Sequence, residues 1–367
     1  MLASFLPAEE VPRELPGPQN YSFIEAYDHQ TERASGLDRM ALVGRTVVRA
    51  HRLGLAAHGH VATSFGPIDA GPAPDGVYAI ANSNGLAAFH LGTRADLSVT
   101  MLDERGHAGW ASARALTLRG IDGDLLGEIA SQKACVLGER QTLESGEYEV
   151  VLEPAAVGGL VGVLGRTCGA ADMAVGQSFL SDRIGDMVTG ESITIIDDNA
   201  HELHCGAPFD VQGVSRRSVP LIEGGRAIGA VYGFESARRA GVDPTGHVVS
   251  DARGRPCERA QHLVMAGGDH SLEEMVSGVK RGVLITRLGT VRVLDARSST
   301  VTAVSRDGTF LIQDGEIVGP LHDVRLQTSV LDLLASVDML GEQILGEDAV
   351  VPAVRASGVM LRPSVGA

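Results

Sequence analysis

Apolar residues recur at helical spacing in several stretches of the chain. In residues 36–54, Met40, Val43 and Val47 fall at i, i+3 and i+7, which predicts an amphipathic helix. Residues 155–165, AAVGGLVGVLG, also look helical, although glycine costs a helix about 1 kcal/mol relative to alanine and this stretch holds four. These glycines indicate close packing rather than intrinsic helix preference. Three further segments have helical character: 122–140, 270–282 and 329–345.

Strand patterns fill most of the remaining chain. They are short runs rich in β-branched residues, some with alternating polarity, at 58–65, 76–83, 96–103, 146–154, 191–198, 218–234, 282–295 and 308–319. Gly-Gly and Asp-Gly pairs lie where two-residue hairpin turns are expected. Hairpins separated by helices, without strict strand-helix alternation, predict an α+β fold rather than a doubly wound parallel sheet.

The distribution of prolines and of periodic segments along the chain predicts three parts. Residues 1–35 contain four prolines and little periodicity, so we expect an extended arm that follows the surface. Residues 36–154 are predicted to form an N-terminal α+β domain, and residues 155–367 a β-rich C-terminal domain.

Charge and composition narrow the functional classes. The 46 acidic residues outnumber the 31 Lys and Arg, and the formal charge of -15 argues against nucleic acid or an anionic membrane as partner. The N-terminus lacks a basic region typical of signal peptides, and no apolar run approaches the ~20 residues that span a bilayer. Four scattered cysteines without a CxxC pair suit reduced thiols. We therefore expect a soluble, cytoplasmic protein.

The stretch HELHC carries the side chains that zinc enzymes use. A zinc helix needs histidines at i and i+4, whereas His201 and His204 are three residues apart and flanked by turn-forming residues. A loop could still gather His201, His204 and Cys205 around zinc, with Glu202 as base. The simpler interpretation is a polar surface loop. We prefer it, and we keep the zinc site in this loop only as an alternative.

Other polar residues lie in turn-rich loops. Ser178 and Ser305 stand among glycines and charges, which suits turn chemistry as well as catalysis. Asp197, Asp198 and Asp210 could bind a hard cation or transfer protons, but loop carboxylates usually cap turns. No catalytic residue is assigned on this basis.

A family resemblance emerges from the order and spacing of several blocks between about residues 79 and 345. They are AIANSNGL, VVLEPAAV, GQSFLSDRIGD, ITIIDDN followed by PFDVQGV, DPTGH, GDHSLEEMVSGVKRGVLIT and SRDGTFLIQDGEIVGPLHDVRLQTSVLD. These blocks resemble the TldD/PmbA family of two-component peptidases, also called modulators of DNA gyrase. The resemblance implies large, mostly antiparallel, curved sheets with packed helices.

The same resemblance implies a role. In the TldD-like half of such pairs, an H-E-x-x-x-H helix follows the strand that matches VVLEP, and a cysteine near the C-terminus completes the zinc site. Here that helix is AAVGGLVGVLGRTC, and residues 346–367 contain no cysteine. The chain therefore resembles the PmbA (TldE) half: no cofactor of its own, zinc in a TldD-like partner, and a heterodimer or homodimer acting on peptides.

The family also implies where substrate would pass. Loops 176–186 and 197–214 would line the route of an unfolded peptide, with Ser178, Asp210 and Ser305 as candidate lining residues. The alternatives left open are a self-contained zinc hydrolase that uses the HELHC loop and a non-catalytic binding scaffold.

Overall fold

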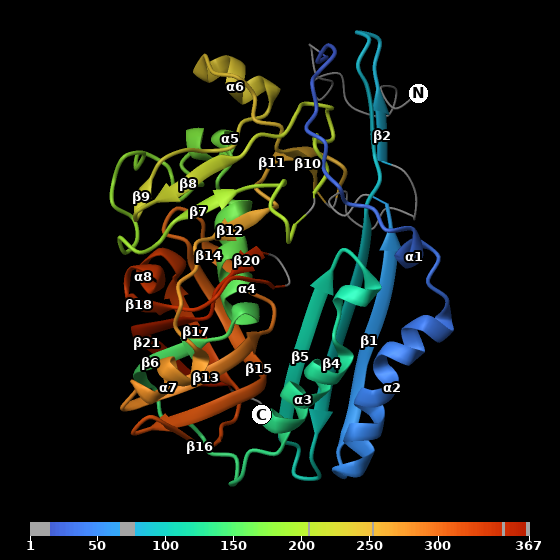
Figure 1. The fold of residues 1–367 in the computed structure, drawn as a ribbon. Coiled ribbons are helices and arrows are strands. Elements are labelled where there is room, and N and C mark those ends of the chain that lie inside the picture. The colour runs from blue at the N-terminus through green and yellow to red at the C-terminus, as the bar shows by residue number, and fades with distance from the viewer. Residues whose placement is uncertain (1–14, 67–77, 205, 252, 347–348, 365–367) are drawn as a thin grey trace.

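The computed structural model describes residues 15–66, 78–204, 206–251, 253–346 and 349–364. A three-stranded sheet lies on one side of the molecule, and two larger sheets with a helix between them lie on the other (Figure 1). Most strand pairs are antiparallel, as the α+β prediction requires, and β6 with β13 and β12 with β20 are the parallel exceptions. The predicted fold class is confirmed. No helix in the described ranges is both long and apolar enough to cross a membrane.

The N-terminal part builds its sheet in the order β1-β4-β5. Its elements are α1 (His29–Glu32), α2 (Gly36–Arg52), β1 (Ala56–Phe65), β2 (Tyr78–Ala81), β3 (Ala87–His90), β4 (Thr93–Leu102), β5 (Ala108–Ala115) and α3 (Gly123–Ala134). Alternation in β4 sends Leu97, Val99 and Met101 into a core beneath α2 and α3. The side chains between them point to the opposite face of the sheet.

The amphipathic helix predicted over residues 36–54 is confirmed as α2. Ser35 caps it, since its side chain accepts from the Asp38 N–H while the Asp38 carboxylate accepts from the Ser35 N–H. The helix buries Thr46 and Ala50. Of the apolar row that identified it, Val43 packs against the core, whereas Met40 is 65% and Val47 56% exposed.

The C-terminal part contains two larger sheets around α4 (Pro154–Arg166), which contacts strands of both. The first has six strands in the order β19-β20-β12-β7-β8-β9: β19 (Ile344–Leu345), β20 (Ala349–Val351), β12 (Leu263–Met265), β7 (Ile195–Asp197), β8 (Val219–Glu223) and β9 (Arg226–Ala227). α4 is buried along most of its length, and an added Cβ at Gly165 would meet the Ala260 carbonyl oxygen at 2.5 Å. Gly165 therefore serves the close packing that was predicted for this helix.

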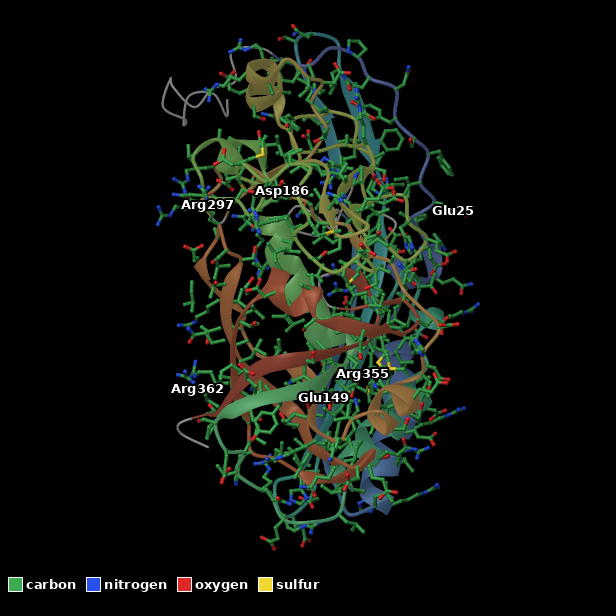
Figure 2. The ribbon with its side chains drawn as sticks, turned by 90° about the vertical axis from the view of Figure 1, so that its left-hand side faces the viewer. Glu25, Glu149, Asp186, Arg297, Arg355 and Arg362 are labelled. Atoms are coloured by element: carbon green, nitrogen blue, oxygen red, sulfur yellow. The ribbon has the colours of Figure 1, made fainter. Side chains whose placement is uncertain are left out.

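The second sheet has eight strands. They are β6 (Gly146–Leu152), β13 (Arg281–Leu288), β14 (Arg292–Asp295), β15 (Thr300–Gln313), β16 (Glu316–Pro320), β17 (Val324–Ser329), β18 (Val337–Leu340) and β21 (Val354–Pro363). Pairing of β13 with both β6 and β15 closes part of this sheet on itself. Figure 2 shows β6 and β21 side by side, with Glu149 and Arg355 labelled on them.

Shorter elements complete the chain: β10 (Val248–Ser250), β11 (Pro256–Glu258), α5 (Ala170–Ala174), α6 (Phe234–Ala240), α7 (Leu272–Ser277) and α8 (Val330–Ala335). The long helix predicted over 329–345 is wrong beyond Ala335, because Val337–Leu340 pairs with β21. The helix predicted over 270–282 ends at Ser277, and Arg281 already begins β13.

The predicted three-part division remains a prediction, and the structure adds two observations to it. Residues 15–28 of the arm form neither helix nor strand, and Tyr21 donates a hydrogen bond from its hydroxyl to the Gly213 carbonyl at 2.7 Å. β6, which precedes the proposed boundary at residue 154, pairs with β13 and β21. This strand thus lies in the sheet of the C-terminal part.

Candidate functional site

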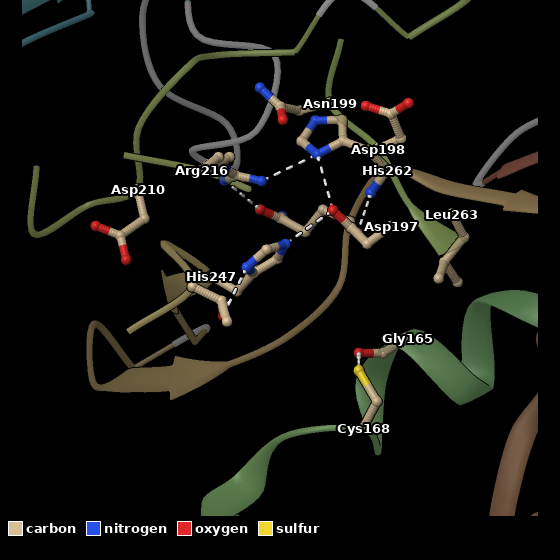
Figure 3. A network of polar contacts seen from close by, with 12 residues as sticks. Gly165, Cys168, Asp197, Asp198, Asn199, Asp210, Arg216, His247, His262 and Leu263 are labelled. Atoms are coloured by element: carbon tan, nitrogen blue, oxygen red, sulfur yellow. Dashed lines mark hydrogen bonds and ion pairs between the residues drawn. The ribbon is translucent and has the colours of Figure 1, made fainter. Parts of the chain in front are cut away.

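A buried polar network lies where β7 ends, beside the HELHC loop (Figure 3). The Asp197 carboxylate is wholly buried and accepts two hydrogen bonds, from His247 Nε2 at 2.9 Å and from the His262 backbone N–H at 2.8 Å. His247 Nδ1 is in turn hydrogen-bonded to Thr245 Oγ1 at 2.9 Å. Asp197 therefore joins β7 to two loops that are distant in sequence.

A buried arginine extends this network. Arg216 Nη1 donates to His262 Nδ1 at 2.9 Å, and its Nε and Nη2 donate to the Phe209 carbonyl and to Gln261 Oε1. None of these three acceptors carries a negative charge in this arrangement. The guanidinium therefore depends on nearby buried carboxylates for its countercharge.

The two buried carboxylates of this region respond differently to their surroundings. Burial alone would raise the pKa of Asp197, but electrostatic interactions with His247, His262 and Arg216 and the hydrogen bond from His247 hold it well below its ordinary value. Burial raises the pKa of Asp210, against the backbone N–H bonds that it accepts from Val248, Gln212 and Val214. Asp197 is the anion that balances the network.

The three residues proposed to line a peptide route have structural contacts. Ser178 Oγ accepts from the Leu180 N–H, Asp210 closes a turn by accepting backbone N–H groups, and Ser305 Oγ accepts from Thr309 Oγ1 and the Val324 N–H. All three are buried. Because these side chains are buried in the single chain, the structure gives no support to their contact with substrate.

The HELHC loop forms a succession of turns rather than a helix. His204 Nε2 donates to the Leu263 carbonyl at 3.0 Å, and His201 Nδ1 accepts from the Leu203 N–H at 3.3 Å. The ring centroids of His201 and His204 are 6.3 Å apart. Cys205, the third ligand of the alternative zinc site, lies outside the described residues.

A surface cavity of about 520 Å³ lies beside this loop. Glu202 borders it from the loop, and Glu25, Tyr27 and Asp28 border it from the arm. The cavity therefore presents carboxylates from two segments far apart in sequence.

The residues at the position of the family's zinc helix do not fit a metal. α4 has the sequence PAAVGGLVGVLGR, which contains no histidine, cysteine or carboxylate. Across the part of the chain that the structure describes, no group of three or more His, Cys, Asp and Glu side chains is placed to hold a metal ion. α4 therefore cannot hold a catalytic zinc ion.

Sequence reasoning noticed Asp197 and Asp210 but missed their partners. Arg216, His247 and His262 belong to other loops, and Asp197 is 50 residues from His247 and 65 from His262. The block DPTGH, which ends at His247, was part of the family pattern and is the signal that could have indicated this histidine.

Comparison with known proteins decides the family. Residues 145–362 match the model for the PmbA/TldA metallopeptidase C-terminal domain, which is more than half of the chain. The chain belongs to the PmbA/TldD metallopeptidase family. The resemblance noted from the sequence blocks is therefore confirmed.

Relatives in this family extend the comparison. A protein named metalloprotease from Methanothermobacter thermautotrophicus is 29% identical over 219 residues, 59% of this chain and 47% of that protein. Metalloprotease PmbA of Escherichia coli O157:H7 is 23% identical over 278 residues, 73% of this chain and 58% of that protein. The chain thus matches about half the length of such curated relatives.

The fold also matches a solved member of the PmbA/TldD group. The crystal structure of TldE from Thermococcus kodakarensis superposes with a TM-score of 0.83 at 21% identity, covering 98% of this chain and 81% of that one. At this identity the match establishes the fold. In this fold, the buried Asp197 network lies at the start of the loop whose Glu202 borders the cavity.

Proposed function

We propose that this chain is a TldE-like subunit, without a catalytic metal of its own, of a cytoplasmic two-component zinc metallopeptidase. A TldD-like partner would supply the zinc and the base that activates water for attack on a peptide carbonyl. This chain would enclose unfolded or small peptides beside the partner's active site, in a housekeeping or a peptide-maturation role.

The composition of α4 carries the proposal. This helix follows β6, in the position where the family resemblance places H-E-x-x-x-H, and all its residues from Ala156 to Leu164 except Gly159 are buried. A buried helix of Gly, Ala, Val and Leu side chains offers no donor to Zn²⁺, which binds N, S and carboxylate ligands. The helix supports a packing role for α4.

Exposed parts of the two candidate loops support contact with peptides. Ile184 and Leu203 are large apolar side chains that remain exposed in loops 176–186 and 197–214, and Met187 is exposed just after the first. Apolar side chains of this kind offer contact area to an extended peptide. They replace the buried Ser178, Asp210 and Ser305 as the residues to test for substrate contact.

Reconstitution with a homologue that carries H-E-x-x-x-H tests the proposal. We expect the two chains to co-purify and to cleave an unfolded peptide only as a mixture, with activity lost on chelation and restored by zinc. Replacing both H-E-x-x-x-H histidines of the homologue should abolish cleavage. Changing His201 and His204 to Ala together in this chain should leave it within about twofold, since neither residue is given a catalytic role.

The alternatives predict different results. If this chain alone cleaves the peptide, and the His201→Ala/His204→Ala variant does not, it is a self-contained hydrolase. If no zinc-bearing homologue binds it and no mixture gains activity, it is a scaffold without a peptidase role. Both outcomes would contradict the proposed function.

A further inference from the structure

The N-terminal arm is bound by two segments that are distant from it in sequence. Figure 1 shows the arm in dark blue, descending from beside β2 to α1. Asn84 Nδ2 donates a hydrogen bond to the Leu15 carbonyl at 2.8 Å. Asn82 Nδ2 donates to the Pro16 carbonyl, also at 2.8 Å. The turn between β2 and β3 therefore binds two consecutive carbonyl groups of the arm.

The second segment is the loop of residues 208–215. The Tyr21 hydroxyl donates to the Gly213 carbonyl at 2.7 Å. The Ser215 N–H donates to Gln19 Oε1 at 3.3 Å. The arm thus contacts the C-terminal part of the chain through this loop and the N-terminal part through the β2–β3 turn.

An aromatic cluster joins the arm, β2 and this loop. The ring centroids of Tyr21 and Phe209 are 5.2 Å apart. Phe209 is also stacked on Tyr78, with centroids 5.1 Å apart and 16° between the ring planes. Phe209 is only 1% exposed with the arm in place. Removal of the Tyr21 ring would expose one side of Phe209, so this position favours an aromatic occupant.

Most side chains of the arm take no part in this binding. Within residues 15–25 only Pro16 is buried, and side chains such as Asn20 and Phe23 are exposed. The two asparagine amides bind backbone carbonyls, which every peptide carries. Main-chain recognition of this kind accepts many sequences, provided that an aromatic side chain replaces Tyr21.

The sequence of the arm favours an extended conformation. Pro16 and Pro18 fix their own φ angles and disfavour helical geometry in the residues before them. A segment that is already extended loses little conformational entropy when it binds. The arm is therefore bound as an unfolded, proline-containing peptide would be.

The arm also follows the loop of residues 197–214, which we expect to line the route of an unfolded peptide. Its contacts with Phe209 and Gly213 lie near the end of that loop. Five arm residues between positions 23 and 28 border the cavity of about 520 Å³ that Glu202 borders from the start of the loop. An extended segment of the chain itself thus lies along the expected route.

We infer that the surface beneath the arm is a binding site for an extended peptide with an aromatic side chain, and that the arm occupies this site in the single chain. The site, called the arm site below, is defined by Asn82, Asn84, Phe209 and Gly213. An incoming peptide would present its carbonyls to the two asparagine amides and its aromatic ring to Phe209. The inference rests on the proposed function in one respect, that the incoming peptide is the substrate.

The arm is anchored separately from the arm site. The Thr93 N–H donates to the Ala26 carbonyl at 2.8 Å, and the Asp28 N–H donates to Thr93 Oγ1 at 2.9 Å. The hydrogen bonds of residues 15–21 are few and partly or fully exposed, as is typical of segments that open locally. The anchor keeps the arm at an effective concentration in the millimolar range, so the wild-type arm should exclude a free peptide.

Peptide binding by the full chain tests this inference. The probe is a fluorescently labelled synthetic peptide with the sequence of residues 15–25, LPGPQNYSFIE, and fluorescence anisotropy measures its binding. Tyr21→Ala removes the arm's aromatic contact, so this variant should bind the probe at least tenfold more tightly than the wild type. Asn20→Ala is the matched control. The Asn20 side chain is exposed and forms no hydrogen bond within the described ranges, so this variant should bind the probe as weakly as the wild type.

Changes in the probe and in the arm site establish where the binding energy arises. A probe with alanine in place of its tyrosine should bind the Tyr21→Ala chain at least tenfold more weakly. Asn84→Asp, which replaces the donor amide by a carboxylate at an exposed position, should also weaken binding of the probe to that chain. No binding by the Tyr21→Ala chain at high micromolar concentrations would overturn the inference. Equal binding by this variant and the wild type, or indifference to the tyrosine of the probe, would also overturn it.

Photo-cross-linking locates the bound probe independently of its affinity. A probe with benzoylphenylalanine in place of its tyrosine should label residues 208–215 of the Tyr21→Ala chain. Labelling confined to other parts of the chain would contradict the arm site.

Reconstitution with a zinc-bearing homologue tests the arm as a competitor of substrate. Tyr21→Ala should lower the KM of the mixture for an unfolded peptide, because the arm and the substrate would compete for one site. An unchanged KM would contradict this competition. Probe binding by a chain that no mixture activates would support the arm site and contradict the proposed function. Cleavage by the mixture without probe binding by the Tyr21→Ala chain would contradict the arm site alone.

Discussion

Asp197→Asn tests the buried network directly. The carboxylate accepts from His247 Nε2 at 2.9 Å and from the His262 N–H at 2.8 Å, and it is fully buried. Asparagine keeps the shape but has one acceptor oxygen, so one donor would face an NH₂ group. The change also removes the countercharge of Arg216. Breaking a buried ion pair by removing one partner costs about 3–5 kcal/mol, and we expect a loss in this range.

The neighbouring residue provides a matched control. Asp198 is only half-buried, and its Oδ1 accepts from the Ala200 N–H at 3.0 Å, a bond that asparagine can also accept. Asp198→Asn removes the same charge one residue away and should change the free energy of unfolding by less than about 0.5 kcal/mol. Urea unfolding followed by circular dichroism measures both variants.

The pH dependence gives a second readout. Because the pKa of Asp197 is lowered in the folded protein, its contribution is fully present above the pKa of an unfolded aspartate, about 3.9, and is lost as pH falls through the folded value. The difference between wild type and Asp197→Asn should therefore be constant from pH 7 to 5 and shrink below about pH 4. Equal stability of the Asp197 and Asp198 variants would refute the assignment of Asp197 as the anchor.

One labelling experiment and two substitutions test other parts of the structure. Burial raises the pKa of the Cys168 thiol to about 12, so a thiol reagent at pH 8 should label exposed Cys135 at once and Cys168 only after unfolding. Lys133→Met should cost about 1–3 kcal/mol in urea unfolding, because it leaves the largely buried Glu153 carboxylate without its 2.6 Å partner. Gly44→Ala should raise the thermal midpoint, with a gain of up to about 1 kcal/mol from helix propensity, because an added Cβ there meets no atom within 4 Å.

Local rules predicted the turns and several elements well. Both central residues of the Gly224-Gly225 and Asp314-Gly315 turns have positive φ, 53° and 79° in the first and 48° and 82° in the second. This is the conformation of the hairpin turn that such pairs predict. The sequence also contained enough periodicity to place α2 and the close-packed α4.

Contacts between residues distant in sequence explain why other elements and the site could not be predicted. Residues 337–340 have apolar spacing that fits a helix, yet β21 offers a partner and the segment pairs as a strand. Asp197 and Asp210 drew attention as possible catalytic carboxylates because they lie in neighbouring loops. The partners of Asp197 could not be foreseen, because they come from loops distant in sequence. Burial and three-dimensional proximity, which no local pattern encodes, gave both carboxylates structural contacts.

In α2, by contrast, the sequence predicted the helix correctly but not which of its side chains are buried. Helical spacing identified Met40, Val43 and Val47 as one apolar face, and such a face normally packs against the core. Here Val43 packs against the core beside the buried Thr46 and Ala50, whereas Met40 and Val47 remain exposed. The pattern identified the right helix, but only part of its apolar row faces the core.

The zinc content of the purified chain tests the central claim most directly. We predict substoichiometric zinc in this chain alone and about one zinc per complex once a homologue with H-E-x-x-x-H is bound, because α4 offers no ligand. The His201→Ala/His204→Ala variant should give the same two values. Near-stoichiometric zinc in the isolated chain, lost in that variant, would contradict the account.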